Sequence, residues 1–181
     1  MSKKKHFRFL LTTLLVLLVA RPALAIDTAS FELGAGQRAR FARVGLQSNW
    51  DSRWWQSNGS HLGGYWDMTL AQWREMRFRG VYDTRESIID VGLTPVLRLQ
   101  PDSKKGLYGE LGIGLHLLSD LYDNDGRRFS TRMQFGDHIG IGYVTQNHLT
   151  VSLQLQHFSN GGIKRPNPGV LLGVLKVALE F

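Results

Sequence analysis

The 181-residue sequence contains no cysteine, which excludes a disulfide framework, thiol chemistry and any metal site with Cys ligands. After the first 25 residues it also lacks a long apolar run, since no later segment approaches the roughly 18–20 apolar residues of a transmembrane helix. The 20 glycines are spread through apolar stretches and form no phosphate-binding loop. The exported chain is therefore either a soluble domain or a β-barrel of an outer membrane.

Residues 1–25 have the three regions of a secretory signal peptide. A basic start is followed by a leucine-rich run over 9–20, and Ala23-Leu24-Ala25 then provides a cleavage site. This run is too short to span a membrane, and a buried N-terminal helix is the alternative interpretation. We expect cleavage after Ala25, which leaves one domain over residues 26–181.

The excess of basic residues lies mostly in this leader. The full chain has a formal charge of +7, but residues 1–25 hold five of the 22 basic residues and none of the 15 acidic ones. The domain that remains has 17 basic and 15 acidic residues, a net charge of +2. The composition therefore gives no support to a nucleic-acid partner.

The rest of the chain alternates between apolar and polar residues, which is typical of β-strands with one buried face. In the segment 107–118, Leu111 and Ile113 share one face, whereas Glu110 and His116 share the other. Eight such segments are predicted: 28–37, 38–49, 61–74, 85–99, 107–118, 133–145, 149–160 and 169–181. They predict an all-β fold, an eight-stranded antiparallel transmembrane β-barrel.

A soluble lipocalin-like barrel is the alternative, and two features favour the membrane. The chain ends in Phe181 on a strand, and tryptophans gather near strand ends as in an aromatic girdle, although all five could equally be core. In a membrane barrel the polar face would line the interior, where charges can pair. The charges expected there are Asp90, Arg98, Glu110, Lys176 and Glu180.

An even number of strands places both termini on the periplasmic side. The segment 149–160 then ends at the outer surface, preceded by a short periplasmic turn at Gln146-Asn147. The segment from Asp120 to Arg132 becomes a long external loop.

The most informative residues are His157 and Ser159, at the outer end of 149–160. They continue the parity of the apolar residues Val151, Leu153 and Leu155, so they would face lipid. An unpaired polar group there costs roughly 1–3 kcal/mol, and polar groups kept at such positions are candidates for function. A Ser beside a His is the minimal nucleophile–base pair, although contact with headgroups or water is the simpler interpretation.

Two blocks of sequence resemble the lipid A 3-O-deacylase (PagL) family of outer-membrane enzymes. One is HFSNGGIKRPNPG at 157–169; the other is WDSRWWQ at 50–56, followed by GYWD at 64–67. The similarity extends over essentially the whole exported chain. The resemblance implies an eight-stranded barrel and a serine esterase that removes the 3-O-linked acyl chain of lipid A without a cofactor.

The resemblance also implies roles for single residues. His157 matches the family's base and Ser159 its nucleophile, while Asn160 and Asn167 match positions that could shape an oxyanion hole. Turn chemistry between two prolines is an equal interpretation of Asn167. The basic residues Lys164 and Arg165 could contact lipid A phosphates or be ordinary solvated loop residues.

One position departs from the family pattern. The family has a Glu fourteen residues after the His, which completes a triad, but this chain has Leu171 there. The nearest carboxylate of that strand is Glu180, at its far end and on the inward face. The third member is therefore missing or comes from another strand.

Asp137 is the candidate for that third member. If the turn spans 146–148, Ile139 lies opposite Leu155 and Asp137 lies opposite His157. A register slip of one residue would turn Asp137 inward. The alternatives are that Asp137 is an ordinary strand-end charge, or that the enzyme needs no acid.

Competing functions are a catalytically impaired or non-catalytic small barrel and a barrel acyltransferase. Retention of the polar pair and of both asparagines favours the deacylase. The histidines lack metal-ligand spacing, so no metal site is expected. The expected location is the bacterial outer membrane, as a multi-pass protein, with lipid A or lipopolysaccharide as partner and a homodimer left open.

Overall fold

The structure is a computed structural model that describes residues 25–37, 39–75, 87–124 and 126–181. The predicted leader lies outside the described residues, apart from Ala25. The strands are β1 (Thr28–Ala35), β2 (Ala39–Asn49), β3 (Trp54–Ser57), β4 (Ser60–Glu75), β5 (Ser87–Pro101), β6 (Gly106–Leu118), β7 (Asp123–Asn124), β8 (Arg127–Arg128), β9 (Met133–Val144), β10 (Leu149–Ser159) and β11 (Val170–Glu180).

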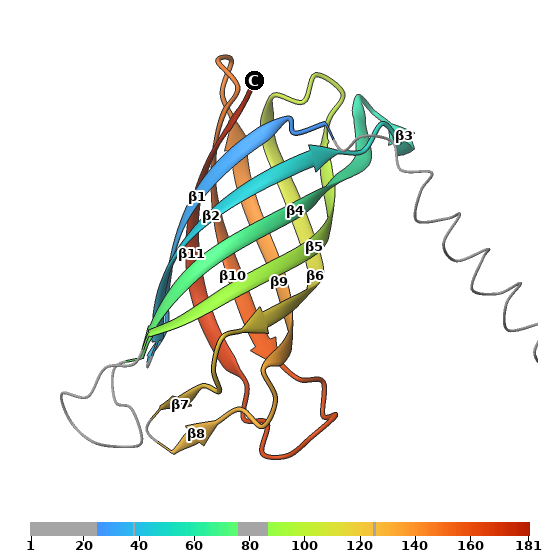
Figure 1. The fold of residues 1–181 in the computed structure, drawn as a ribbon. Helices are drawn as coiled ribbons and strands as arrows, with labels where there is room; N and C mark the ends of the chain where they lie inside the picture. Colours follow the sequence, from blue (N-terminus) through green and yellow to red (C-terminus); the bar gives the residue numbers. More distant parts are fainter. Residues whose placement is uncertain (1–24, 38, 76–86, 125) are drawn as a thin grey trace, which may run out of the picture.

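Eight of these strands pair into a closed barrel, whose overall shape can be followed in Figure 1. The order around it is β1, β2, β4, β5, β6, β9, β10 and β11, and β11 pairs back with β1. Every pairing is antiparallel. The prediction of an eight-stranded antiparallel barrel is confirmed. The short strand β3 pairs with β4, and β7 with β8 form a small hairpin within the predicted external loop.

The two ends of the barrel differ. At the terminal end, Thr28 pairs with Glu180, and β9 turns into β10 within 145–149. At the opposite loop end lie the β7–β8 hairpin and the long connection over 160–169 (Figure 1). The predicted arrangement of termini, short turn and long loop is therefore confirmed, and β10 ends at the loop end with Ser159.

The outward face is apolar and the inward face is polar. Large residues such as Ile139, Ile141 and Leu153 are more than 60% exposed on the outside. Inside, Lys176 pairs with Asp67 at 2.7 Å and Glu32 at 3.3 Å. This polarity is that of a membrane barrel, because a soluble barrel would bury its apolar face.

The other expected interior charges are also paired. Arg98 donates to Glu110 at 2.9 Å, and Asp90 contacts the His116 ring at 2.9 Å. Buried charges need such partners. Glu180 instead lies at the rim, where it is 3.2 Å from His148.

An aromatic cluster fills the loop end of the interior. Trp73 packs against Phe158 with ring centroids 4.8 Å apart, and Phe158 packs against His116 at 4.9 Å. Trp73 and Phe158 are both fully buried. Trp73 is therefore a core residue, whereas Trp54, Trp55 and Trp66 are exposed near the terminal end, as a girdle requires.

Candidate active site

The pairing register between β9 and β10 brings the first two residues of the candidate site together. Asp137 pairs with His157, and Ile139 pairs with Leu155, so the predicted register is confirmed. The Asp137 Oδ1 atom lies 3.2 Å from His157 Nδ1. A carboxylate accepts hydrogen bonds, so His157 Nδ1 carries the hydrogen of this bond.

This bond sets the chemistry of the imidazole. With Nδ1 protonated, the neutral ring presents Nε2 as an acceptor, which is the tautomer that a general base needs. The His157 side chain is 41% exposed and that of Asp137 is 47% exposed. Both lie on the outer, lipid-facing surface, and their pairing reduces the cost of polar groups at that position.

Gly169 leaves room for the free edge of the His157 ring. A Cβ atom on Gly169 would lie 2.5 Å from His157 Nε2, and its φ of +66° is one that residues with side chains rarely adopt. Phe158 pairs with Val170, so Ser159, the next residue outward, lies across from Gly169. The Nε2 atom therefore lies toward the level of Ser159.

Ser159 is the final residue of β10 and shares the outward face with His157. Its Oγ accepts a 3.4 Å hydrogen bond from the Gly161 N–H. Within the described residues no hydrogen bond joins Ser159 to His157. Residues two apart on a strand lie about 6.5–7 Å apart at Cα, and catalytic hydrogen bonds often shorten only when substrate binds.

Asn160 holds the 160–169 loop together. It is fully buried, and its Nδ2 donates to the Lys164 carbonyl at 2.7 Å and to Ser130 Oγ at 3.0 Å. Its Oδ1 accepts from the Gly162 N–H at 3.0 Å. An amide has two N–H groups. Both are used here, so the side chain organises the loop and is not directed at a substrate oxygen.

Asn167 is arranged differently. Its Oδ1 accepts a 3.0 Å hydrogen bond from the Asn160 backbone N–H, and the residue is half-buried. The Asn167 Nδ2 donates no hydrogen bond within the part of the chain that the structure describes. The Asn167 side-chain oxygen therefore takes part in the turn, while its amide nitrogen is available as a donor among the described residues.

The position expected to hold a glutamate lies on the other side of His157. Leu171 pairs directly with His157 across β10 and β11 and is 60% exposed. His157 thus has a leucine beside it on β11 and an aspartate beside it on β9. The basic residues Lys164 and Arg165 are exposed in the loop beyond Ser159.

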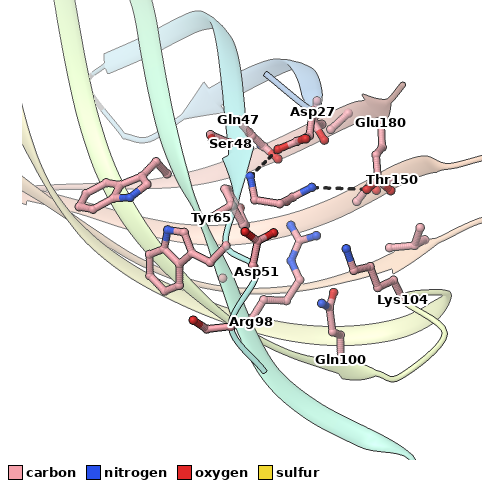
Figure 2. Close-up of a pocket in the computed structure, with 18 of the residues that line it drawn as sticks. Asp27, Gln47, Ser48, Asp51, Tyr65, Arg98, Gln100, Lys104, Thr150 and Glu180 are labelled. Carbon is pink, nitrogen blue, oxygen red and sulfur yellow. Dashed lines mark hydrogen bonds between the residues drawn. The ribbon is translucent and has the colours of Figure 1, made fainter. Parts of the chain in front are cut away.

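A large cavity lies far from these residues. It has a volume of about 690 Å³ and opens at the terminal end, among residues such as Asp27, Arg98 and Glu180. Figure 2 shows Asp27, Arg98 and Glu180 among the side chains that line it. The Asn49 backbone N–H donates to Asp27 Oδ2 at 2.6 Å, and the Asn49 Nδ2 donates to Glu180 Oε1 at 3.4 Å. It lies at the opposite end of β10 from Ser159, so it is not part of the candidate site.

The described ranges contain no cluster of three or more His, Cys, Asp or Glu side chains that could hold a metal ion. They also contain no helix of the length and apolarity needed to cross a membrane.

Comparison with known proteins decides the family. A sequence model of the family described as lipid A 3-O-deacylase (PagL) matches residues 40–177. The chain belongs to the lipid A 3-O-deacylase (PagL) family. The matched range includes all the candidate residues, from Asp137 and His157 to Ser159, Asn160 and Asn167.

Individual PagL proteins agree with this assignment. The lipid A deacylase PagL of Pseudomonas aeruginosa (strain PAO1) is 30% identical over 148 residues, 82% of each chain. The lipid A deacylase PagL of Bordetella bronchiseptica (strain RB50) is 40% identical over 74 residues, 41% of each chain. The crystal structure of the outer membrane enzyme PagL superposes with a TM-score of 0.71 at 27% identity, covering 85% of this chain and 99% of that one.

Proposed function

We propose that this chain hydrolyses the 3-O-linked acyl ester of lipid A with Ser159 as nucleophile, His157 as base and Asp137 as the third member of the triad. As a PagL-family barrel it is a lipid A deacylase, an ester hydrolase of the outer membrane. The observation that carries the residue assignment is the hydrogen-bonded pair of Asp137 and His157 on the lipid-facing side, next to Ser159.

The reaction follows from this arrangement. Ser159 Oγ attacks the ester carbonyl while His157 Nε2 takes its proton. Asp137 stabilises the imidazolium that forms, and the tetrahedral intermediate then expels the 3-hydroxyl of the sugar, which receives the proton from His157. Water, activated by the same imidazole, hydrolyses the acyl-Ser159 ester and releases the fatty acid.

We propose that the side-chain amide of Asn167 donates a hydrogen bond to the oxyanion of the tetrahedral intermediate. Its Oδ1 is fixed by the Asn160 N–H, which orients the amide, and its Nδ2 remains available among the described residues. A preorganised donor of this kind stabilises the charge that develops on the carbonyl oxygen.

The test is the lipid A mass spectrum of bacteria that express the chain. With defined hexa-acylated lipid A, we expect loss of one hydroxyacyl unit with the unaltered chain and none with Ser159→Ala. Ser152→Ala, on the inward face of the same strand, is the matched control. Lipid A from bacteria that express this variant should still lack one hydroxyacyl unit. An unchanged spectrum from the correctly folded, unaltered barrel, or full activity of Ser159→Ala, would overturn the proposal.

Two further proposals concern processing and assembly. Cleavage after Ala25 would give a chain that begins at Ile26, which N-terminal sequencing of the membrane protein would show.

The apolar outer face could contact either lipid or a second copy. Cross-linking in the membrane would distinguish a homodimer from a monomer.

A further inference from the structure

A second, smaller hollow lies at the loop end of the barrel, beside the candidate triad. Its volume is about 230 Å³. It is formed where the start of β11, the β1–β2 connection and the β7–β8 hairpin meet. The lining residues are Gln37, Tyr122, Arg127, Gly169, Val170 and Leu171.

This hollow shares two residues with the surroundings of His157. Leu171 is the cross-strand neighbour of His157, and Gly169 lies against His157 Nε2. A chemical group bound in the hollow would therefore lie beside His157, within reach of a substrate whose ester lies at Ser159. The hollow flanks His157 on the β11 side, whereas Asp137 occupies the β9 side.

Arg127 provides the positive charge of the hollow. Its Nη1 donates a long, 3.5 Å hydrogen bond to the Gly169 carbonyl, which places the guanidinium over the start of β11. Within the described ranges no carboxylate lies within ion-pair distance of it. The neighbouring arginines of the same loop are paired: Arg128 with Asp123 at 4.0 Å and Arg132 with Asp120 at 3.4 Å.

The availability of this guanidinium points to an anionic ligand. Arginine presents five N–H donors in a planar fork that fits a phosphate. Among the described residues only the Nη1 group of Arg127 donates a hydrogen bond, to the Gly169 carbonyl. Arg127 belongs to the loop beyond the barrel strands, whereas Ser159 lies at a strand end. A lipid whose ester reaches Ser159 would place its polar headgroup at the level of Arg127.

We propose that the hollow is a subsite for a phosphate group of the lipid A headgroup and that Arg127 binds this phosphate. The inference rests on the proposed function and adds a residue that orients the substrate. Lys164 and Arg165 are also basic, but neither lines the hollow. Arg127 therefore determines the position of the headgroup, and these loop residues contribute only general attraction.

Kinetics with two substrates test this subsite. For lipid A that carries its phosphates, Arg127→Gln should raise KM about tenfold while kcat changes less than twofold, because a charge-assisted hydrogen bond to the headgroup is lost. For chemically dephosphorylated lipid A, the same variant should match the unaltered enzyme. Arg127→Lys should recover part of the loss, and Arg128→Gln is the matched control that should change neither substrate.

Binding to Ser159→Ala separates this inference from the proposed function. In that background, Arg127→Gln should weaken binding of phosphorylated lipid A about tenfold even if the chain catalyses a different reaction. Equal losses on both substrates would make Arg127 a structural residue and overturn the proposal. Unchanged KM and unchanged binding would overturn it as well.

Discussion

Asp137 Oδ1 lies 3.2 Å from His157 Nδ1, although the two residues belong to different strands and are 20 positions apart. The strand on the other side of β10 brings Leu171 to the equivalent place beside His157. A barrel wall thus gives one histidine two cross-strand neighbours, and either could carry a triad acid. In this chain the carboxylate is on β9.

The first prediction concerns Asp137. Asp137→Asn should lower kcat by on the order of 10²–10⁴-fold, because the imidazole loses the group that fixes its tautomer and stabilises its charge. The measurement is the initial rate of fatty acid release by the purified barrel, with heat-modifiable gel mobility as the check on folding. An unchanged rate would show that the enzyme works without this acid.

The second prediction moves the acid across the histidine. The double variant Asp137→Asn with Leu171→Glu should react at least tenfold faster than Asp137→Asn alone, because position 171 is also a direct neighbour of His157. Leu171→Gln in the same background is the control, since it adds polarity without charge. If both double variants behave alike, the recovered activity does not come from a carboxylate.

The third prediction concerns the space beside the imidazole. Gly169→Ala should lower kcat at least tenfold, because the new Cβ would displace His157 Nε2 and the φ of +66° would be strained. Gly173→Ala, further along β11, is the matched control. Its Cβ would lie 3.9 Å from its nearest neighbour, so the rate should not change. Equal behaviour of the two variants would remove Gly169 from the site.

The fourth prediction separates the observed loop contact of Asn167 from its proposed role as oxyanion donor. Asn167→Asp keeps an oxygen to accept the Asn160 N–H but removes the amide donor. We expect kcat to fall about 10²–10³-fold, as when an oxyanion donor is lost. Protease resistance of the 160–169 loop in intact cells should stay the same. A loop that becomes sensitive to protease would show that the role of Asn167 is structural.

Much of the fold was predictable because a two-residue period specifies a strand face. The parity of His157 and Ser159 with Leu155 placed them on the outer surface, and the short turn before β10 fixed which residue of β9 meets His157. The apolar pairs along these strands allow one register, and that register also positions Asp137. Local sequence rules were sufficient to predict this pairing because β9, the turn after it and β10 follow one another directly in the chain.

The features that the sequence did not reveal depend on distant segments. Trp73 is a core residue because it meets Phe158 of β10 inside the barrel, which strand periodicity alone cannot show. The Asn160 amide bonds to Ser130, from a loop 30 residues away. The hollow beside Arg127 is formed by three segments that are far apart in the chain. A glycine before a strand, such as Gly169, was the available signal for a close approach.

Covalent labelling tests the central claim, a serine activated by the Asp137–His157 pair, most directly. The purified barrel would be treated with a lipid-tailed phosphonate that reacts with activated serine hydroxyls, and the modified peptide would be identified by mass spectrometry. The account predicts a single adduct on Ser159, absent in Ser159→Ala and formed at least 100-fold more slowly in His157→Ala. An adduct on another residue, or full deacylase activity in Ser159→Ala, would contradict it.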